Sequence, residues 1–146
     1  MAPSAELLAQ LDSISDAKSP EQLARLERAT ATLKPESCGR EEFRALLGVL
    51  ERFPLDDGLE SFWSIVHLLE ACEGYEPYLV ASVSRRPAEL TLTMLSRLLN
   101  AGLTHCGDIS YASMLASAAT DTSVAPELRV RAAHLLEHQG MRASGA

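Results

Sequence analysis

Apolar residues recur at helical spacing along nearly the whole chain, and Pro or Gly interrupts them at short intervals. Residues three and four positions apart share one face of an α-helix, so this pattern predicts amphipathic helices that pack on one another. Aromatic residues make up only 5% of the chain, which disfavours a β-sandwich. We therefore expect an all-α fold with no sheet. The pattern predicts about eight helices, over residues 4–16, 20–34, 40–53, 57–73, 77–85, 87–100, 109–120 and 126–139.

Several predicted helix ends carry residues that stabilise such ends. Ser19 stands three residues before Gln22, which predicts a capping box in which each side chain bonds the backbone N–H of the other. Asp57 and Glu60 have the same spacing and predict the start of the fourth helix, while Gly140 predicts the end of the last one. Helices of this length joined by short turns favour antiparallel pairs, arranged as a helical bundle or a short HEAT-like stack of helical repeats.

The chain has 146 residues, which is close to the usual size of one domain. We therefore expect a single helical domain over residues 1–146, with a frayed tail over residues 141–146. The tetrapeptide His-Leu-Leu-Glu occurs at residues 67–70 and again at residues 134–137. Short leucine-rich matches also arise by chance, so this repeated tetrapeptide does not decide whether the chain contains a duplicated helical unit.

The negative charge of the chain is concentrated in one segment. Thirteen Lys and Arg against twenty Asp and Glu give a net charge of −7. Residues 53–76 contain no Lys or Arg, and their acidic residues are Asp56, Asp57, Glu60, Glu70, Glu73 and Glu76. A field of this sign repels nucleic-acid backbones and anionic lipid surfaces, so it argues against both as partners. It favours a basic protein partner.

Cysteine usage and hydropathy point to the cytoplasm. The three cysteines, Cys38, Cys72 and Cys106, are widely spaced and form no C-x-x-C pair, so neither a disulfide framework nor a zinc knuckle is indicated. The first residues lack the basic region of a signal peptide. No segment approaches the roughly twenty apolar residues that a membrane span needs. We expect reduced thiols, a cytoplasmic location and no membrane insertion.

One motif suggests catalysis but lacks the rest of a site. His134 and His138 match the H-x-x-E-H pattern of inverted zinc peptidases, yet few residues follow to supply a third ligand, and both fall on a polar helix face. The carboxylates of residues 60–76 lack the paired Glu-x-x-His spacing of a di-metal site. No nucleophile motif and no glycine-rich phosphate loop is present. We therefore predict no enzymatic activity, no metal and no cofactor.

The predicted fourth helix offers the best candidate for a partner-binding surface. Trp63 falls at the boundary between its polar and buried faces, so it is either a half-buried wedge against the next helix or an exposed anchor within an acidic rim. Aromatic anchors surrounded by charged residues are typical of protein interfaces. The predicted partner-binding residues are Asp56, Asp57, Glu60, Trp63, Glu70, Glu73, Tyr75, Glu76 and Tyr78.

Part of the chain resembles small bacterial immunity proteins, which protect cells from polymorphic toxins of the contact-dependent and Rhs types. The similar segments are His67-Leu68-Leu69-Glu70, Tyr75-Glu76-Pro77-Tyr78-Leu79, Arg86-Pro87-Ala88-Glu89-Leu90 and Arg97-Leu98-Leu99-Asn100-Ala101-Gly102. The resemblance implies an all-helical protein without enzymatic activity that binds a cognate toxin domain in the cytoplasm and blocks its active site. It assigns no contact residue.

Two other functions stay open. Residues 126–132 are similar to helical-repeat proteins in general, so a helical-repeat adaptor or regulatory subunit with a basic partner is the second candidate. An unrecognised enzyme is the third.

Overall fold

The computed structural model describes residues 3–144, and this part of the chain folds almost entirely into α-helices. The predicted all-α fold class is therefore confirmed. The helices found between residues 3 and 144 are α1 (Pro3–Asp12), α2 (Pro20–Thr32), the short 3-10 helix η1 (Pro35–Ser37), α3 (Arg40–Arg52), α4 (Trp63–Ala71), α5 (Glu76–Arg85), α6 (Glu89–Asn100), α7 (Tyr111–Thr120) and α8 (Pro126–Ser144).

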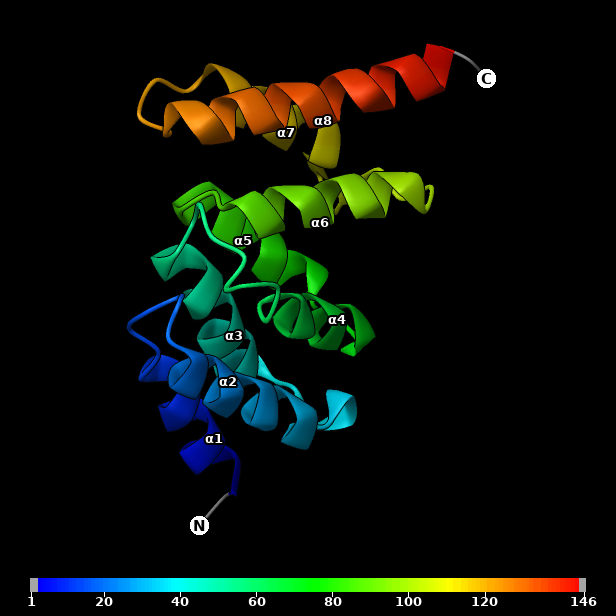
Figure 1. Cartoon of the computed structure of the whole chain (residues 1–146). Helices are drawn as coiled ribbons and strands as arrows, with labels where there is room; N and C mark the ends of the chain where they lie inside the picture. Colours follow the sequence, from blue (N-terminus) through cyan, green and yellow to red (C-terminus); the bar gives the residue numbers. More distant parts are fainter. Residues whose placement is uncertain (1–2, 145–146) are drawn as a thin grey trace.

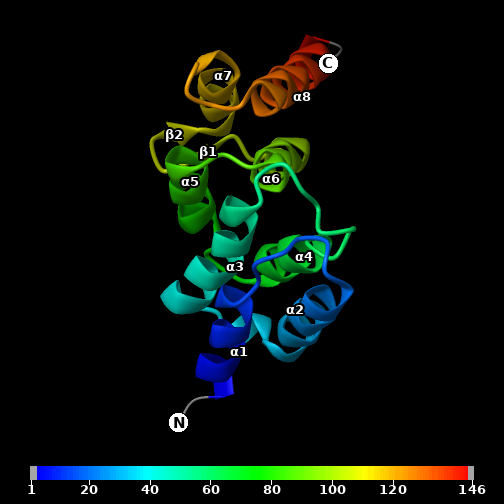
Figure 2. The ribbon, with the colours of Figure 1, turned by 60° about the vertical axis from the view of Figure 1, so that its left-hand side comes forward.

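Consecutive helices are stacked in pairs along one direction (Figure 1). The α1–α2 pair forms one end, α3 and α4 lie on it, α5 and α6 follow, and the α7–α8 pair forms the other end. Figure 2 shows the same order from another side. The buried apolar residues form one cluster that extends from Leu11 to Leu135, so each layer packs its apolar stripes against the next.

The start of α2 confirms one half of the predicted capping box. The Ser19 hydroxyl oxygen accepts the backbone N–H of Gln22 at 3.2 Å, as an N-cap residue does. The Gln22 side chain does not return to Ser19. Its Oε1 atom accepts the backbone N–H groups of Ser15 at 2.7 Å and Asp16 at 3.1 Å. The reciprocal half of the prediction is wrong because the preceding turn presents two donors to this amide.

The fourth helix begins later than the sequence predicts. α4 starts at Trp63, and Asp57 lies in the turn before it. Gly58, Leu59 and Glu60 have φ angles of +59°, +52° and +78°, in the left-handed region that a right-handed helix cannot contain. The predicted helix start at Asp57 is therefore wrong. The capping spacing is present in the sequence, but three consecutive left-handed residues turn the chain instead.

Two further expectations are corrected near the end of the chain. The strands β1 (His105–Cys106) and β2 (Ile109–Ser110) pair antiparallel around Gly107, whose φ is +58°, so the expectation of no sheet is wrong. Glycine at positive φ closes such tight hairpins. α8 runs through Gly140, which is not left-handed, so the predicted stop there is also wrong. Residues 145–146 of the predicted frayed tail lie outside the described part.

The remaining helices lie where the pattern predicts, with ends that differ by up to four residues. Cys38, Cys72 and Cys106 are free thiols, and Cys72 is the buried one of the three.

Candidate partner-binding surface

The connection between α3 and α4 is held at both ends by buried or partly buried contacts. We refer to its residues 54–62 as the acidic loop. At its start, the Pro54 carbonyl oxygen accepts the backbone N–H of Glu89 at 2.7 Å. At its end, the buried Ser61 hydroxyl donates to the Glu27 carboxylate of α2 at 2.6 Å, and the Phe62 ring is fully buried. Hydrogen bonds to α6 and α2, together with the buried Phe62 ring, therefore fix the path of the loop.

The acidic loop has a strained backbone and an exposed apolar pair. Leu59 and Glu60 are the non-glycine residues at positive φ between residues 3 and 144, and each left-handed L-residue costs about 1 kcal/mol. Leu59 is 61% exposed and Leu55 is 50% exposed. Such strain persists only where the surroundings enforce it, and it is common at functional sites. Two leucines held towards solvent are the feature of this loop that packing within the chain does not explain.

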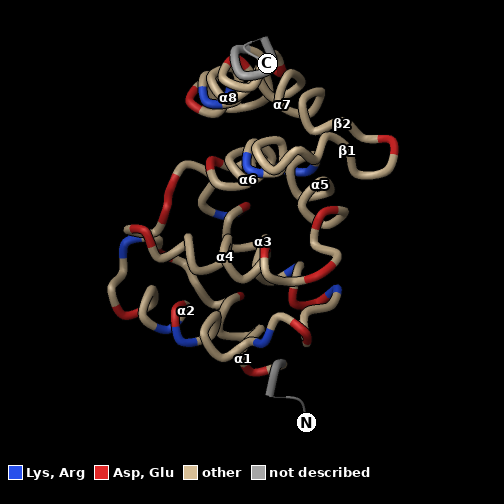
Figure 3. Tube along the Cα trace, turned by 90° about the vertical axis from the view of Figure 1, so that its right-hand side faces the viewer, with Lys and Arg blue, Asp and Glu red and all other residues tan. Residues whose placement is uncertain are grey.

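Three carboxylates are next to these leucines in the sequence of the acidic loop. Asp57 and Glu60 are exposed and Asp56 is half-buried. Within the described residues, none of the three side chains has a hydrogen-bond or ion-pair partner. Figure 3 shows these acidic positions on the trace before α4. The loop is therefore an apolar pair set in uncompensated negative charge.

Trp63 is half-buried beside the acidic loop, at the start of α4. The Arg97 guanidinium of α6 lies over its ring at 5.8 Å from the centroid, and the His67 ring lies 5.9 Å away. Arg97 also forms two hydrogen bonds to the Glu70 carboxylate, at 2.7 and 2.8 Å. This pairing raises the pKa of Arg97. Trp63 is thus packed against the next helix pair with part of its ring accessible.

Glu70 differs from the other acidic residues of its segment because Arg97 neutralises it. Residues 53–76 contain no Lys or Arg, but Arg97 of α6 lies against this segment through its pair with Glu70. Glu70 and Arg97 line an open hollow of about 600 Å³ together with Tyr75 and Glu76. Leu103, which is 50% exposed, also lines this hollow.

Neither predicted tyrosine is freely exposed. Tyr75 is buried, and burial, followed by the nearby Glu70 and Glu76 carboxylates, raises its pKa to about 12. Tyr78 is half-buried and stacks on Phe43, with the ring centroids 4.6 Å apart. Tyr75 is therefore a core residue, and Tyr78 offers only part of its ring.

The predicted partner-binding residues do not form one continuous patch. Asp56, Asp57, Glu60 and Trp63 lie at the start of α4, whereas Glu73 and Glu76 lie beyond its other end. A helix of nine residues separates the two groups by roughly 13 Å along its axis. The acidic loop with Trp63 is the group that combines exposed apolar area with free charge, so it is the stronger candidate.

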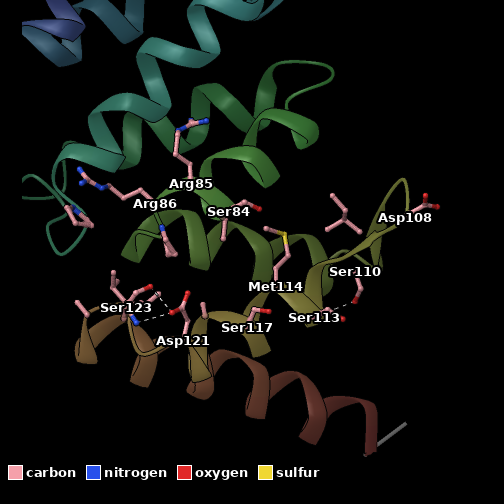
Figure 4. A pocket seen from close by; sticks show the side chains of 18 residues that line it. Ser84, Arg85, Arg86, Asp108, Ser110, Ser113, Met114, Ser117, Asp121 and Ser123 are labelled. Atoms are coloured by element: carbon pink, nitrogen blue, oxygen red, sulfur yellow. Dashed lines mark hydrogen bonds between the residues drawn. The ribbon is translucent and has the colours of Figure 1, made fainter.

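A separate cavity of about 640 Å³ lies between the end of α5, the β1–β2 turn and α7, and sequence reasoning did not identify it (Figure 4). Ser84 of α5 and Ser113 and Ser117 of α7 line it. At its edge, Asp121 accepts the backbone N–H and the hydroxyl of Ser123, which lowers the pKa of this carboxyl. Among the described lining residues there is no histidine that could act as the general base for a serine. The sequence signal for this cavity was the spacing of Ser113 and Ser117, which are four residues apart and therefore share one face of α7.

His134 and His138 both lie on the exposed face of α8. In the part of the chain that the structure describes, no group of three or more His, Cys, Asp or Glu side chains is placed to hold a metal ion.

Three comparisons with known proteins found no relative of this chain. No family model, no curated protein and no solved structure matches it. Among the described helices, none has the length and apolar character needed to cross a membrane.

Proposed function

We propose that this chain is a binding protein without enzymatic activity that neutralises a cognate toxin domain, as the immunity proteins of polymorphic toxin systems do. The acidic loop carries the proposal, because Leu55 and Leu59 are exposed among three carboxylates that no residue of the described chain neutralises. An apolar centre with a charged rim is the usual anatomy of a protein interface. The resemblance of residues 67–102 to immunity proteins supplies the toxin as the partner.

The fixed shape of the acidic loop supports binding over a purely structural role. Phe62 and Ser61 hold one end of the loop in the core, and Pro54 holds the other through Glu89. A surface that is already ordered loses little conformational entropy when a partner binds. The strain at Leu59 is compatible with this role, since the buried contacts enforce it in the free protein.

The partner that fits this surface is basic. Lys or Arg side chains around an apolar contact would pair with Asp56, Asp57 and Glu60, and the summed field would speed association. Association should therefore slow as ionic strength rises, because salt screens exposed charges within about 10 Å at 0.1 M. We place this binding in the cytoplasm and expect no nucleic acid and no membrane surface as partner, because the loop would repel both.

A helical-repeat adaptor or regulatory subunit is the second candidate. The stacking of consecutive helix pairs favours it, since such stacks present extended faces to partners (Figure 1). Both functions predict binding through a surface, and they differ in what happens to the partner: a toxin loses activity, whereas the partner of an adaptor keeps its own.

The neighbouring gene and a protection assay separate these functions. The toxin proposal expects a gene for a large toxin immediately upstream, and its C-terminal domain provides the test partner. Cells that express this domain should grow only when the chain is present. The purified pair should form a stable complex in which the toxin domain is inactive. A folded chain that binds this domain without inhibiting it, or a chain with no toxin gene beside it, would favour the adaptor.

A matched pair of double variants tests the acidic loop. Leu59→Ser with Glu60→Lys removes an exposed leucine and reverses one charge while keeping the loop backbone. Val130→Ser with Glu127→Lys makes the same changes on α8, where Val130 is 67% exposed and Glu127 is also exposed. Loss of an interface anchor costs about 2 kcal/mol, or roughly thirtyfold in affinity. Only the loop variant should lose affinity and protection. Full protection by a folded loop variant places the interface elsewhere.

A further inference from the structure

A groove between α3 and α5 carries charge of the opposite sign. It has a volume of about 530 Å³, and the arginines that line it are Arg40, Arg44, Arg52, Arg85 and Arg86. Positions 40, 44, 48 and 52 are four residues apart and form one stripe along α3. Positions 78, 81 and 85 form the facing stripe on α5. Two helices therefore direct their cations into one hollow of a chain whose net charge is −7.

Two of these arginines are neutralised by neighbouring carboxylates. Arg85 donates to both oxygens of Glu51, at 3.0 and 2.6 Å. Arg44 contacts Asp12 at 3.3 Å and Glu41 at 3.2 Å. These pairs raise the pKa of both guanidinium groups. They use Glu41 and Glu51, the two described carboxylates that line the groove, and Asp12 of α1, which lies outside its lining.

The other three arginines form no hydrogen bond or ion pair with a carboxylate among residues 3–144, and Arg86 acts on Glu51 only through its charge. Arg52 donates to the backbone carbonyl oxygens of Leu11 at 2.8 Å and Ile14 at 3.3 Å, so its charge is not neutralised. Arg40 and Arg86 have no hydrogen bond or ion pair from their side chains in this described part. Five arginines thus line the groove with two carboxylates, and a surplus of two positive charges remains when Asp12, the outside partner of Arg44, is also counted.

The groove stays open because its floor consists of small residues. Gly48 of α3 and Ala81 of α5 are the smallest residues that line it, and we call these two residues the floor. Glycine inside a helix costs about 1 kcal/mol relative to alanine. A Cβ atom at position 48 would meet only Arg52 Nη1, at the ordinary contact distance of 3.5 Å, so packing within the chain does not require glycine here. Tyr78, fixed by its stack on Phe43, forms part of one wall.

We propose that this groove binds a small ligand that carries two or more phosphate groups. Guanidinium groups pair with phosphate oxygens through two parallel hydrogen bonds, and Arg40 and Arg86 are unoccupied for this purpose. The surplus of two charges matches a ligand with several negative charges, and the volume is within the range of small-molecule sites. Glu41 and Glu51 in the groove, with Asp12 beside Arg44, disfavour a long acidic polymer, because its further charges would meet these carboxylates. The inference is independent of the toxin proposal.

Calorimetric titration with sodium tripolyphosphate at fixed ionic strength tests the proposal. The full chain should bind it in a saturable way with one site, and Arg40→Ala with Arg86→Ala should weaken binding by at least about tenfold. The matched control is Arg28→Ala with Lys34→Ala, which removes the same charge outside the groove and should leave binding within about twofold. Both residues are exposed and do not line the groove.

A substitution on the floor separates shape from charge. Gly48→Leu should fill the groove and weaken binding, whereas Gly48→Ala should keep it and also favour α3. Helical circular dichroism of each variant shows that it is folded. Three results would overturn the proposal: no saturable binding, equal weakening in both arginine and control pairs, or tighter binding of a polyglutamate peptide or an oligonucleotide than of tripolyphosphate.

Discussion

Substitution of Gly58 by alanine probes how firmly the acidic loop is held. Gly58 has a φ of +59°, and a Cβ atom there would lie 2.5 Å from two carbons of the Phe62 ring. Real Cβ atoms do not approach other atoms so closely, so the ring or the loop must move. Phe62 is fully buried and has no free space to move into.

The expected loss of stability combines two effects. Alanine at positive φ costs about 1 kcal/mol more than glycine, and overpacking a buried ring costs about 1–3 kcal/mol. Gly58→Ala should therefore lower the free energy of unfolding by about 2–4 kcal/mol, partly offset by the smaller entropy of the unfolded chain. For a protein of this size, that corresponds to a fall in Tm of roughly 5–15 °C.

Gly107→Ala is the matched control for this experiment. Gly107 has a φ of +58°, and nothing lies within 4 Å of a Cβ atom placed there. It therefore experiences the same backbone cost and the same change in the unfolded chain, without the collision. Urea unfolding of both variants isolates the contact with Phe62. Equal losses, within about 0.5 kcal/mol, would refute the close packing of the loop on this ring.

Two further predictions concern charge and pH. Arg97→Ala should lower the free energy of unfolding by about 1 kcal/mol, because its pair with Glu70 is partly exposed. The variant should also shift the fluorescence emission of Trp63, the single tryptophan, towards that of a water-exposed ring. An unchanged spectrum would contradict the stacking of Arg97 on Trp63. Burial raises the pKa of Tyr75 from 10.0 to about 12, so its neutral form stabilises the fold fully below pH 10 and this contribution is lost as pH rises through 12. The Cys72 thiol, whose pKa burial raises from 9.0 to about 12, adds a loss of the same sign. Urea unfolding between pH 9 and 12 should show a fall that Tyr75→Phe reduces, and an identical fall in that variant would be evidence against the shift.

Local sequence signals predicted the helices because each signal acts within a few residues. Ser19 caps α2, and the apolar spacing of α3 buries Phe43 and Leu46 as expected. The predicted start of α4 is wrong because the local capping signal competes with contacts to distant parts of the chain. Asp57 and Glu60 have cap spacing, but burial of Phe62 and the hydrogen bond from Ser61 to α2 draw the chain into a left-handed turn.

The candidate site was predictable only in part, for a similar reason. Residues 53–76 do hold the exposed acidic loop, and the boundary position of Trp63 is confirmed by its half-buried ring. The exposure of Leu59 was not foreseen, because a helical register would place it in the core. Burial of Tyr75 also depends on packing that a single segment does not encode. The arginine groove has a local signal in the sequence, because Arg40, Arg44, Gly48 and Arg52 follow one another at intervals of four residues along α3.

An acidic residue in this sequence does not always contribute free negative charge to the surface, because the fold pairs some carboxylates with distant arginines. Charge-reversal experiments must distinguish paired from unpaired carboxylates. Reversal of Glu70 looks like a surface change in the sequence, but it would leave Arg97 facing another cation and disturb the ring of Trp63. Loss of binding in such a variant would then report damage to the α4–α6 contact. The Glu60 carboxylate has no hydrogen-bond or ion-pair partner among the described residues, so reversal of its charge changes the field without breaking a side-chain contact. The charge-reversal variants of Glu60 and Glu70 must therefore be compared in stability as well as in binding. Only a variant that keeps the stability of the protein reports how its charge affects binding.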